Sequence, residues 1–343
     1  MCIRDRLYAK VLRSPHPSAY IKTIDYTRAL ELPGVYAVIT HEDAKLLYMP
    51  SHGQAREYGL DDMVRYVGDK VAMVAAETEE LAEEALEYIN VEYEALPAVF
   101  DMEEAMKPDA PVVHPERQEL DTNVNILEIS IQEWGNVEDG FKQADYIIEN
   151  RFYTQRVCHC ALEPHAMVAE WDLEGNLVMW SSEQTAFMIR DSLAEALNMP
   201  RSKIRFIVPE YVGGGFGGKY ESAEKIALAI LARKAGRPVM LKLNREEEFY
   251  TTRTRSPCIF ETKTGVSKDG FLLARQMKAV VDVGSYAWGA IMASRAASYL
   301  TLLYKCPNIK YTGYGVFTNT PPSGAMRGFT STPIHYALSL IHI

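Results

Sequence analysis

The sequence predicts an α+β protein with two domains, and three observations support this prediction. The chain has 343 residues with 48% hydrophobic content, which is enough for more than one buried core. Short strand and helix patterns alternate along it without an internal repeat. Residues 101–125 are rich in proline and charge and lack periodicity, as expected of a linker. We therefore expect one domain over residues 7–100 and a second over residues 126–338.

The first domain is predicted from apolar strand patterns separated by short helices. Thr27 can cap a short helix, and Thr78 is a suitable N-cap for a longer helix whose apolar face includes Leu81 and Leu86. The segments before and after the longer helix have strand patterns, so they predict a βαβ unit. Strands are expected at residues 7–14, 19–26, 34–40, 70–77 and 90–96.

The second domain is predicted to begin with a helix and a strand over residues 136–154 and to continue through a β-hairpin that turns at residues 173–176. Gly236 and Pro238 mark the end of a helix that starts near residue 221. Another helix is expected over residues 187–200, and strands at 203–210, 239–244, 259–266 and 272–286.

The most informative stretch is VPEYVGGGFGGKYES, residues 208–222, which joins a predicted strand to a predicted helix. Within it, five glycines, Phe216 and Lys219 fill residues 213–219, which we call the glycine loop. Glycine accepts φ > 0 and lets the backbone approach a ligand closely, so that N–H groups can point at oxygen atoms. The glycine loop therefore predicts an anionic or oxygen-rich ligand.

Two nucleotide-binding patterns fit the glycine loop incompletely. Residues 213–218 spell GxGxxG, but the acidic residue that should end the next strand is displaced to the run Glu246–Glu248. The loop also spells the start of a P-loop, but Tyr220 stands where Ser or Thr should bind magnesium. A P-loop-like nucleotide-binding module stays an alternative, as does a purely structural turn.

Composition and charge exclude several classes of protein. The formal net charge is -10 and no basic cluster interrupts it, so nucleic acid is not an expected partner. No apolar stretch approaches the roughly 18 residues of a spanning helix, and no secretion signal opens the chain. The five cysteines are odd in number and lack a disulfide spacing, which suits reduced thiols. We therefore expect a cytoplasmic protein with no membrane partner.

Four stretches occur in the order and at the spacing typical of one family. They are the glycine loop, ALEPHAMVAEW from residue 161, WSSEQTAF from residue 180 and PPSGAMRGF from residue 321. Together they resemble the molybdenum hydroxylases, the xanthine dehydrogenase and aldehyde oxidase family. The resemblance implies an a/b hammerhead domain over residues 7–100. It also implies that residues 126–338 are the truncated first half of a molybdenum-cofactor-binding α+β domain.

The resemblance implies cofactor contacts around a molybdenum that is held through a pterin dithiolene, with no protein ligand to the metal. Gln184 would donate its amide to the oxo ligand. Gly215, Phe216 and Gly217 would place their backbone against the metal centre. Arg327 would bind the substrate or the cofactor.

Substrate contacts are implied in the same way. Arg295 would orient a purine-like ring and stabilise charge that develops on it, and Phe329 would pack on that ring. Tyr220 would line the pocket at a position where xanthine-type members have a glutamate, which makes xanthine itself doubtful as the substrate. We expect an N-heteroaromatic substrate with an aldehyde as the alternative, and Gln184, Arg295 and Arg327 as the catalytic residues.

The implied reaction is hydroxylation with water, and the two electrons released leave through [2Fe-2S] clusters to FAD. Five scattered cysteines cannot hold such clusters, so an iron-sulfur subunit and an FAD-binding subunit, or missing segments, are expected in an oligomeric assembly. The family's catalytic glutamate lies in a C-terminal motif without a counterpart here, so the chain is expected to be inactive alone. A non-catalytic scaffold of the same fold stays an alternative.

Two other charged or sulfur-rich stretches are expected to be structural. Cys158 and Cys160 would share one face of a strand while His159 points away, so no protein metal site is predicted there. The nearby Glu163 and His165 follow the family pattern and are expected to be structural. The run Glu246–Glu248 is expected to be a solvated charge run.

Overall fold

The structure is a computed structural model, and it describes residues 5–48, 57–117, 125–220, 223–286, 291–302 and 304–339. The chain forms two compact units, each assembled from segments that are distant in the sequence. The first unit combines residues 1–98, 158–253 and 319–321, and the second combines residues 99–157, 254–318 and 322–343. Helices accompany both parallel and antiparallel strands, which confirms the α+β class.

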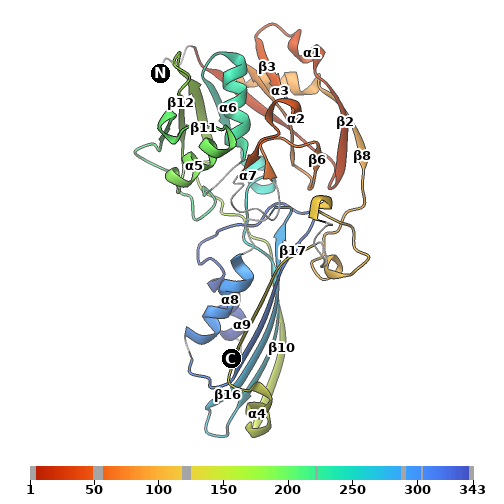
Figure 1. The fold of residues 1–343 in the computed structure, drawn as a ribbon, viewed down its shortest axis with the longest axis vertical. Helices are drawn as coiled ribbons and strands as arrows, with labels where there is room; N and C mark the ends of the chain where they lie inside the picture. The colour runs from red at the N-terminus through yellow and green to blue at the C-terminus, as the bar shows by residue number, and fades with distance from the viewer. Residues whose placement is uncertain are drawn as a thin grey trace. The chain divides into compact units, whose positions relative to one another are not determined.

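A seven-stranded sheet forms the centre of the first unit (Figure 1). Its strands, in order across the sheet, are β13 (Ile204–Ile207), β12 (Leu177–Ser181), β11 (Ala166–Trp171), β14 (Val239–Lys242), β1 (Leu7–Arg13), β7 (Lys70–Ala76) and β3 (Val35–Ile39). β1 is parallel to β14 and antiparallel to β7. All of β7 is buried, as its continuous apolar run predicts for a strand covered on both faces. The start of the chain and the segment after the glycine loop therefore share one sheet.

Two small sheets complete the strands of the first unit. One contains β6 (Met63–Val64), β2 (Ala19–Asp25) and β8 (Asn90–Ala95), and the other pairs β4 (Leu47–Tyr48) with β5 (Glu57–Tyr58). β7 and β8 lie in different sheets, so the predicted βαβ unit is wrong. α3 (Glu79–Glu87) instead connects the fully buried β7 to β8, which has no fully buried residue. Periodicity alone does not show whether the strand after a helix returns to the same sheet or joins a different one.

The predicted helix caps have different outcomes. The hydroxyl of Thr78 accepts the N–H of Leu81 at 3.1 Å, which confirms Thr78 as the N-cap of α3. Thr27 is not a cap, because it is the first residue of α1 (Thr27–Leu30) and its N–H donates to Asp25 Oδ1 at 3.0 Å. Gly236 ends α6 (Glu224–Ala235) with φ 63°, as expected of a left-handed C-terminal glycine.

α6 is the main helix of the first unit and packs on β11, β14, β7 and β3. Its buried face includes Ile226, Leu228 and Leu231, because the helix is apolar on most sides. The predicted hairpin at residues 173–176 is present and joins β11 to β12. The other helices of this unit are α2 (His41–Ala44), α5 (Ala186–Ala196), α7 (Arg245–Tyr250) and the 3₁₀ helix η5 (Arg201–Lys203).

The second unit is built on a five-stranded sheet with α8 (Ile291–Leu302) and α9 (Ser331–Ser339) on the same side of it (Figure 1). Its strands, in order across the sheet, are β10 (Tyr146–Thr154), β15 (Cys258–Val266), β16 (Leu272–Gly284), β17 (Ile309–Phe317) and β9 (Ile126–Trp134). Phe260 and Met277 of the sheet meet Leu300 and Ile334 of the helices in the core. The remaining helices are α4 (Val137–Gln143), η3 (Glu104–Met106) and η4 (Pro115–Arg117).

The domains predicted from the sequence, residues 7–100 and 126–338 with a linker at 101–125, are each continuous along the chain. The two compact units instead combine segments that are distant in the sequence. Strands β9 and β17 and helices α8 and α9 have no counterpart among the predicted elements. Within the described ranges, no helix combines the length and the apolar composition needed to cross a bilayer.

Candidate functional site

The glycine loop lies in the first unit between β13 and α6, in the predicted strand–loop–helix order. Gly214, Phe216 and Gly217 have φ values of +95°, +55° and +98°. In the part of the chain that the structure describes, the N–H groups of Gly214, Gly215 and Phe216 donate to no acceptor. Successive N–H groups in such alternating conformations form a concavity that binds anions or oxygen atoms.

Gln184 contacts the glycine loop from the segment between β12 and α5. Its side-chain Oε1 accepts the N–H of Gly217 at 2.9 Å, and its backbone N–H donates to the carbonyl of Lys219 at 2.7 Å. A Cβ atom at Gly215 would lie 2.5 Å from Gln184 Oε1, so this close approach requires glycine. Because Oε1 accepts from the loop, the exposed amide NH₂ of Gln184 is left to donate to a ligand.

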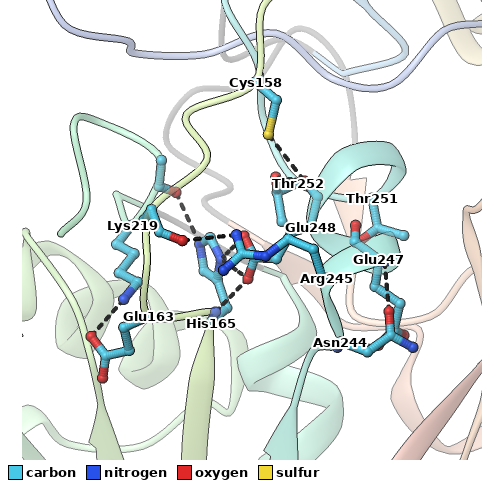
Figure 2. A network of polar contacts seen from close by, with 12 residues as sticks. Cys158, Glu163, His165, Lys219, Asn244, Arg245, Glu247, Glu248, Thr251 and Thr252 are labelled. Atoms are coloured by element: carbon cyan, nitrogen blue, oxygen red, sulfur yellow. Dashed lines mark hydrogen bonds and ion pairs between the residues drawn. The ribbon is translucent and has the colours of Figure 1, made fainter. Parts of the chain in front are cut away.

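The lysine of the glycine loop is engaged inside the protein. Lys219 is 1% exposed, and its Nζ lies 2.7 Å from Glu163 Oε2 (Figure 2). The same oxygen accepts the N–H of Gly213 at 2.6 Å. Burial acts to raise the pKa of the Glu163 carboxyl, but its hydrogen bonds with Lys219 and Gly213 outweigh this effect and lower that pKa. Lys219 is therefore not placed as a P-loop lysine, whose amine must reach a phosphate.

A fully buried ion pair lies next to Gln184. Glu183 Oε2 is 2.7 Å from Nζ of Lys225, which belongs to α6, and the two side chains are 0% and 1% exposed. Glu183 Oε1 also accepts the backbone N–H of Gln184 at 3.0 Å. The pair therefore fixes the backbone from which Gln184 reaches the glycine loop. Neither member of this pair is among the residues predicted from the sequence.

The run Glu246–Glu248 is not a solvated charge run, so this prediction is wrong. Glu247 and Glu248 belong to α7 and are 7% and 4% exposed. Glu247 lies 3.3 Å from the Arg13 guanidinium, and Glu248 lies 2.9 Å from Nδ1 of His165. A run of identical letters does not show which side of a short helix is buried, and here that side carries two partnered carboxylates.

The segment from Cys158 to Cys160 is a loop instead of the expected strand, and Cys160 has φ +50°. Burial raises the pKa of the Cys158 thiol. The four cysteines that the structure describes are free thiols. Among the described residues, no group of three or more His, Cys, Asp or Glu side chains is arranged to hold a metal ion.

Tyr220 follows the glycine loop directly and is half-buried. Its hydroxyl lies 3.6 Å from the Met188 sulfur of α5, and its carbonyl accepts from the hydroxyl of Thr185. These contacts attach the end of the loop to α5 in the same unit as Gln184.

The other predicted site residues lie in the second unit. The guanidinium carbon of Arg295, on α8, lies 5.3 Å from the ring centroid of Phe329, in cation–π geometry. Arg295 and Arg327 are exposed, and Phe329 is half-buried. The carbonyl of Arg327 accepts from the Arg255 guanidinium, which holds the backbone of this segment. The predicted site residues thus form one group in each unit, and their individual roles stay predictions.

Comparison with known proteins places this geometry in a family. The sequence pattern of the molybdopterin cofactor-binding domain matches residues 117–341. The pattern of the aldehyde oxidase and xanthine dehydrogenase a/b hammerhead domain matches residues 1–97. The fold and the two matches define a molybdopterin-binding protein with an a/b hammerhead domain. The chain belongs to the molybdenum hydroxylase family of xanthine dehydrogenases and aldehyde oxidases, which confirms the resemblance drawn from the sequence.

Three relatives show how far the similarity extends. The chain is 37% identical to the nicotinate dehydrogenase large molybdopterin subunit of Eubacterium barkeri, over 95% of this chain and 75% of that one. It is 32% identical to the xanthine dehydrogenase molybdenum-binding subunit of Escherichia coli, over 96% of this chain and 45% of that one. The structure of the aldehyde oxidoreductase from Desulfovibrio gigas superposes with a TM-score of 0.89 at 28% identity, over 96% of this chain and 37% of that one. The chain therefore spans less than half the length of the last two proteins.

Proposed function

We propose that the full-length protein catalyses the oxidative hydroxylation of an N-heteroaromatic compound, and that this chain binds the molybdenum cofactor. The observation that carries the proposal is the glycine loop, where three successive N–H groups lie beside the amide of Gln184. When bound, a pterin-held molybdenum supplies the two-electron oxidation of a substrate carbon with an oxygen atom from water.

The residues of the first unit fit such a group. A metal that is held by a pterin needs hydrogen bonds to its oxygen ligands instead of protein ligands. The glycine loop offers backbone N–H donors, while the ammonium of its Lys219 is paired with Glu163. Gln184 would donate its amide, and Gly215, Phe216 and Gly217 would line the centre with backbone. Arg327, with its exposed guanidinium, would bind the substrate or an anionic part of the cofactor.

The substrate class is proposed from Arg295 and Phe329. A guanidinium next to an aromatic ring suits a flat, electron-poor ring that carries a carbonyl or carboxylate oxygen. Two of the relatives are named for nicotinate and xanthine, which are N-heteroaromatic compounds, while the third is named for aldehydes. Tyr220, in the first unit, is proposed as a further substrate contact. An aldehyde stays the competing substrate.

The partners and location are proposed on similar grounds. Electrons would leave through an iron-sulfur subunit to an FAD-binding subunit, because the five cysteines of this chain are too few and too scattered for the clusters. A cytoplasmic location suits the free thiols of the described cysteines.

The first experiment measures the molybdenum content of the protein. The full open reading frame would be expressed with its neighbouring subunits, and molybdenum and released pterin quantified per protein. Near-stoichiometric molybdenum, followed by turnover of a purine or a pyridine carboxylate, would support the proposal. Turnover of aldehydes alone would contradict the substrate class, and a folded protein without molybdenum would contradict the function.

A further inference from the structure

We propose that His165 is a buried imidazolium and acts as a positioning residue that holds the glycine loop in place through the carbonyl of Gly218. The proposal rests on the proposed function, because that function is what gives the glycine loop a ligand to bind. Its physical content, the protonation of one ring and the anchoring of one carbonyl, belongs to the first unit alone.

His165 lies immediately before β11, between α7 and the glycine loop, as Figure 2 shows. Its Nδ1 is 2.9 and 3.0 Å from the two carboxylate oxygens of Glu248, and this carboxylate also accepts its backbone N–H. Its Nε2 is 3.1 Å from the carbonyl oxygen of Gly218. His165 and Glu248 are 7% and 4% exposed, so water has little access to either ring nitrogen.

Both ring nitrogens therefore face hydrogen-bond acceptors. A neutral imidazole carries one N–H, so the lone pair of its other nitrogen would face either the carboxylate or the carbonyl oxygen. Such a contact is costly where water cannot relieve it. The imidazolium carries both protons and satisfies both acceptors, with Glu248 as its counter-ion.

The alternative is a neutral Glu248 that donates a proton to the ring. Burial acts to raise the pKa of the Glu248 carboxyl, but its hydrogen bonds with the side chain and backbone of His165 outweigh it, and the Arg245 guanidinium lowers that pKa further. The backbone N–H of His165 also donates to this carboxylate. The other titratable groups nearby include Glu163, Lys219, Cys158 and His159, and the His159 ring lies next to Gly218. Glu163 and Lys219 neutralise each other as an ion pair, so Glu248 stays the anion that faces the ring.

The consequence is mechanical. Gly218 belongs to the glycine loop, and its carbonyl accepts a charge-assisted hydrogen bond from His165, directly before β11. The neighbouring Lys219 is tied to Glu163, which lies in the same segment before β11. The C-terminal end of the loop is thus fixed by two buried cations, while the N–H groups of its N-terminal half stay available to a ligand.

The matched control is His114, which has the same arrangement in the second unit. Its Nδ1 is 2.8 Å from Glu116 Oε1, and its Nε2 is 2.8 Å from the carbonyl oxygen of Ser285. Both of these ring contacts lie within the second unit, so His114 separates the loss of a buried histidine from the loss of this anchor.

The test has two readouts on the full-length protein. Neutron diffraction from deuterated crystals near neutral pH should show deuterium on both ring nitrogens of His165, and a single deuteron would overturn the proposal. Hydrogen–deuterium exchange by mass spectrometry should rise about tenfold over residues 213–219 in H165Q and E248Q, and should stay unchanged in H114Q. Unchanged exchange in E248Q, or an equal rise in H114Q, would also overturn it.

These readouts do not depend on the cofactor. A molybdenum-free protein with both deuterons on His165 would contradict the proposed function and keep this inference. A molybdenum-loaded enzyme with a single deuteron on His165 would contradict this inference and keep the proposed function. If H165Q does not fold, the neutron measurement on the unmodified protein still decides.

Discussion

Gln184 owes its position to residues that take no part in hydrogen bonding to a ligand. The carboxylate of Glu183 binds both the Gln184 backbone N–H and the ammonium of Lys225, in an interior from which water is excluded. A buried ion pair adds little net stability, because desolvation of the two charges offsets their attraction. Its removal is nevertheless costly when one charge stays behind.

Substitution of Glu183 tests this pair. E183Q leaves the ammonium of Lys225 buried without its counter-ion, so we expect the free energy of unfolding to fall by about 3 kcal/mol. Chemical denaturation would measure it. The control is K142M, which breaks the exposed Lys142–Asp139 pair on α4 and should leave the unfolding midpoint unchanged. Equal effects of E183Q and K142M would contradict the burial argument.

Arg295 is the residue on which substrate class depends. If its guanidinium stabilises charge on a heteroaromatic ring, R295M should lower kcat/KM for that substrate by roughly 100-fold, the usual scale for one electrostatic donor. Small aldehydes offer no ring nitrogen, so their kcat/KM should fall much less. Steady-state kinetics of the loaded enzyme would measure both, with K142M as the control. A similar loss for both substrate classes would show that Arg295 acts on the fold or on the cofactor.

At the scale of the element, the glycine loop combines a rigid end with an open one. At the rigid end, hydrogen bonds or an ion pair connect the loop to side chains of neighbouring segments, through Gly213, Gly217, Gly218 and Lys219. The N–H groups of residues 214–216 are not, as far as the described chain shows. The glycines serve different purposes, since Gly214 and Gly217 have positive φ while Gly215 provides space for Gln184.

Substitution of Gly215 separates cofactor binding from stability. The added Cβ of G215A would lie 2.5 Å from Gln184 Oε1, so the Gln184 side chain must move and release the N–H of Gly217. The displaced Gln184 amide would also lose its hydrogen bond to the cofactor, worth about 1 kcal/mol, so we expect roughly fivefold weaker retention of molybdenum with only a small decrease in the melting temperature. Elemental analysis after dialysis would measure this retention.

The control for G215A is G175A in the β11–β12 hairpin. Among the described residues, apart from Gly175 and its two chain neighbours, no atom lies within 4 Å of a Cβ at Gly175, although its φ of +78° makes the substitution strained. G175A should therefore lower the melting temperature and leave the molybdenum content unchanged. Loss of molybdenum in G175A, or full retention in G215A, would contradict the role given to the loop.

The sequence predicts elements well where local signals are strong. Apolar runs predict the strands β1, β7 and β15. Capping residues predict where helices begin and end, as at Thr78 for α3 and Gly236 for α6. β17 and α8 escape prediction because β17 contains two glycines and α8 is rich in small residues, so neither shows a clear period. Local patterns describe the chain one turn or one strand at a time.

The site is predictable only in part, for the same reason. The motifs lead to Gln184 and the glycine loop, but Glu163 and Lys219 are 56 residues apart, and His165 and Glu248 are 83 apart. Such partners are set by the tertiary fold. One signal is available in the sequence, since Lys225 stands directly before the apolar run of residues 226–232 in helix α6 and needs an anion once that end of the helix is buried.

At the scale of the whole molecule, the first unit depends on contacts between its N-terminal segment and residues 158–253. β1 pairs with β14, and the Arg13 guanidinium lies 2.8 Å from the Glu224 carboxylate of α6. Burial acts to lower the pKa of Arg13, but the charges of Glu224 and Glu247 outweigh it and raise that pKa. Both carboxylates belong to the later segment, so the earlier segment alone would hold an unpartnered cation.

Expression of residues 1–98 alone tests this dependence. Without the later segment, β1 becomes an exposed sheet edge and Arg13 loses both carboxylates, so we expect aggregation and no cooperative unfolding transition. A single chain that joins residues 1–98 to 158–253 through a flexible linker should restore cooperative unfolding, followed by near-ultraviolet circular dichroism. Cooperative unfolding of residues 1–98 alone would instead make the hammerhead segment an autonomous domain, and the shared sheet a later addition to a fold that is already complete.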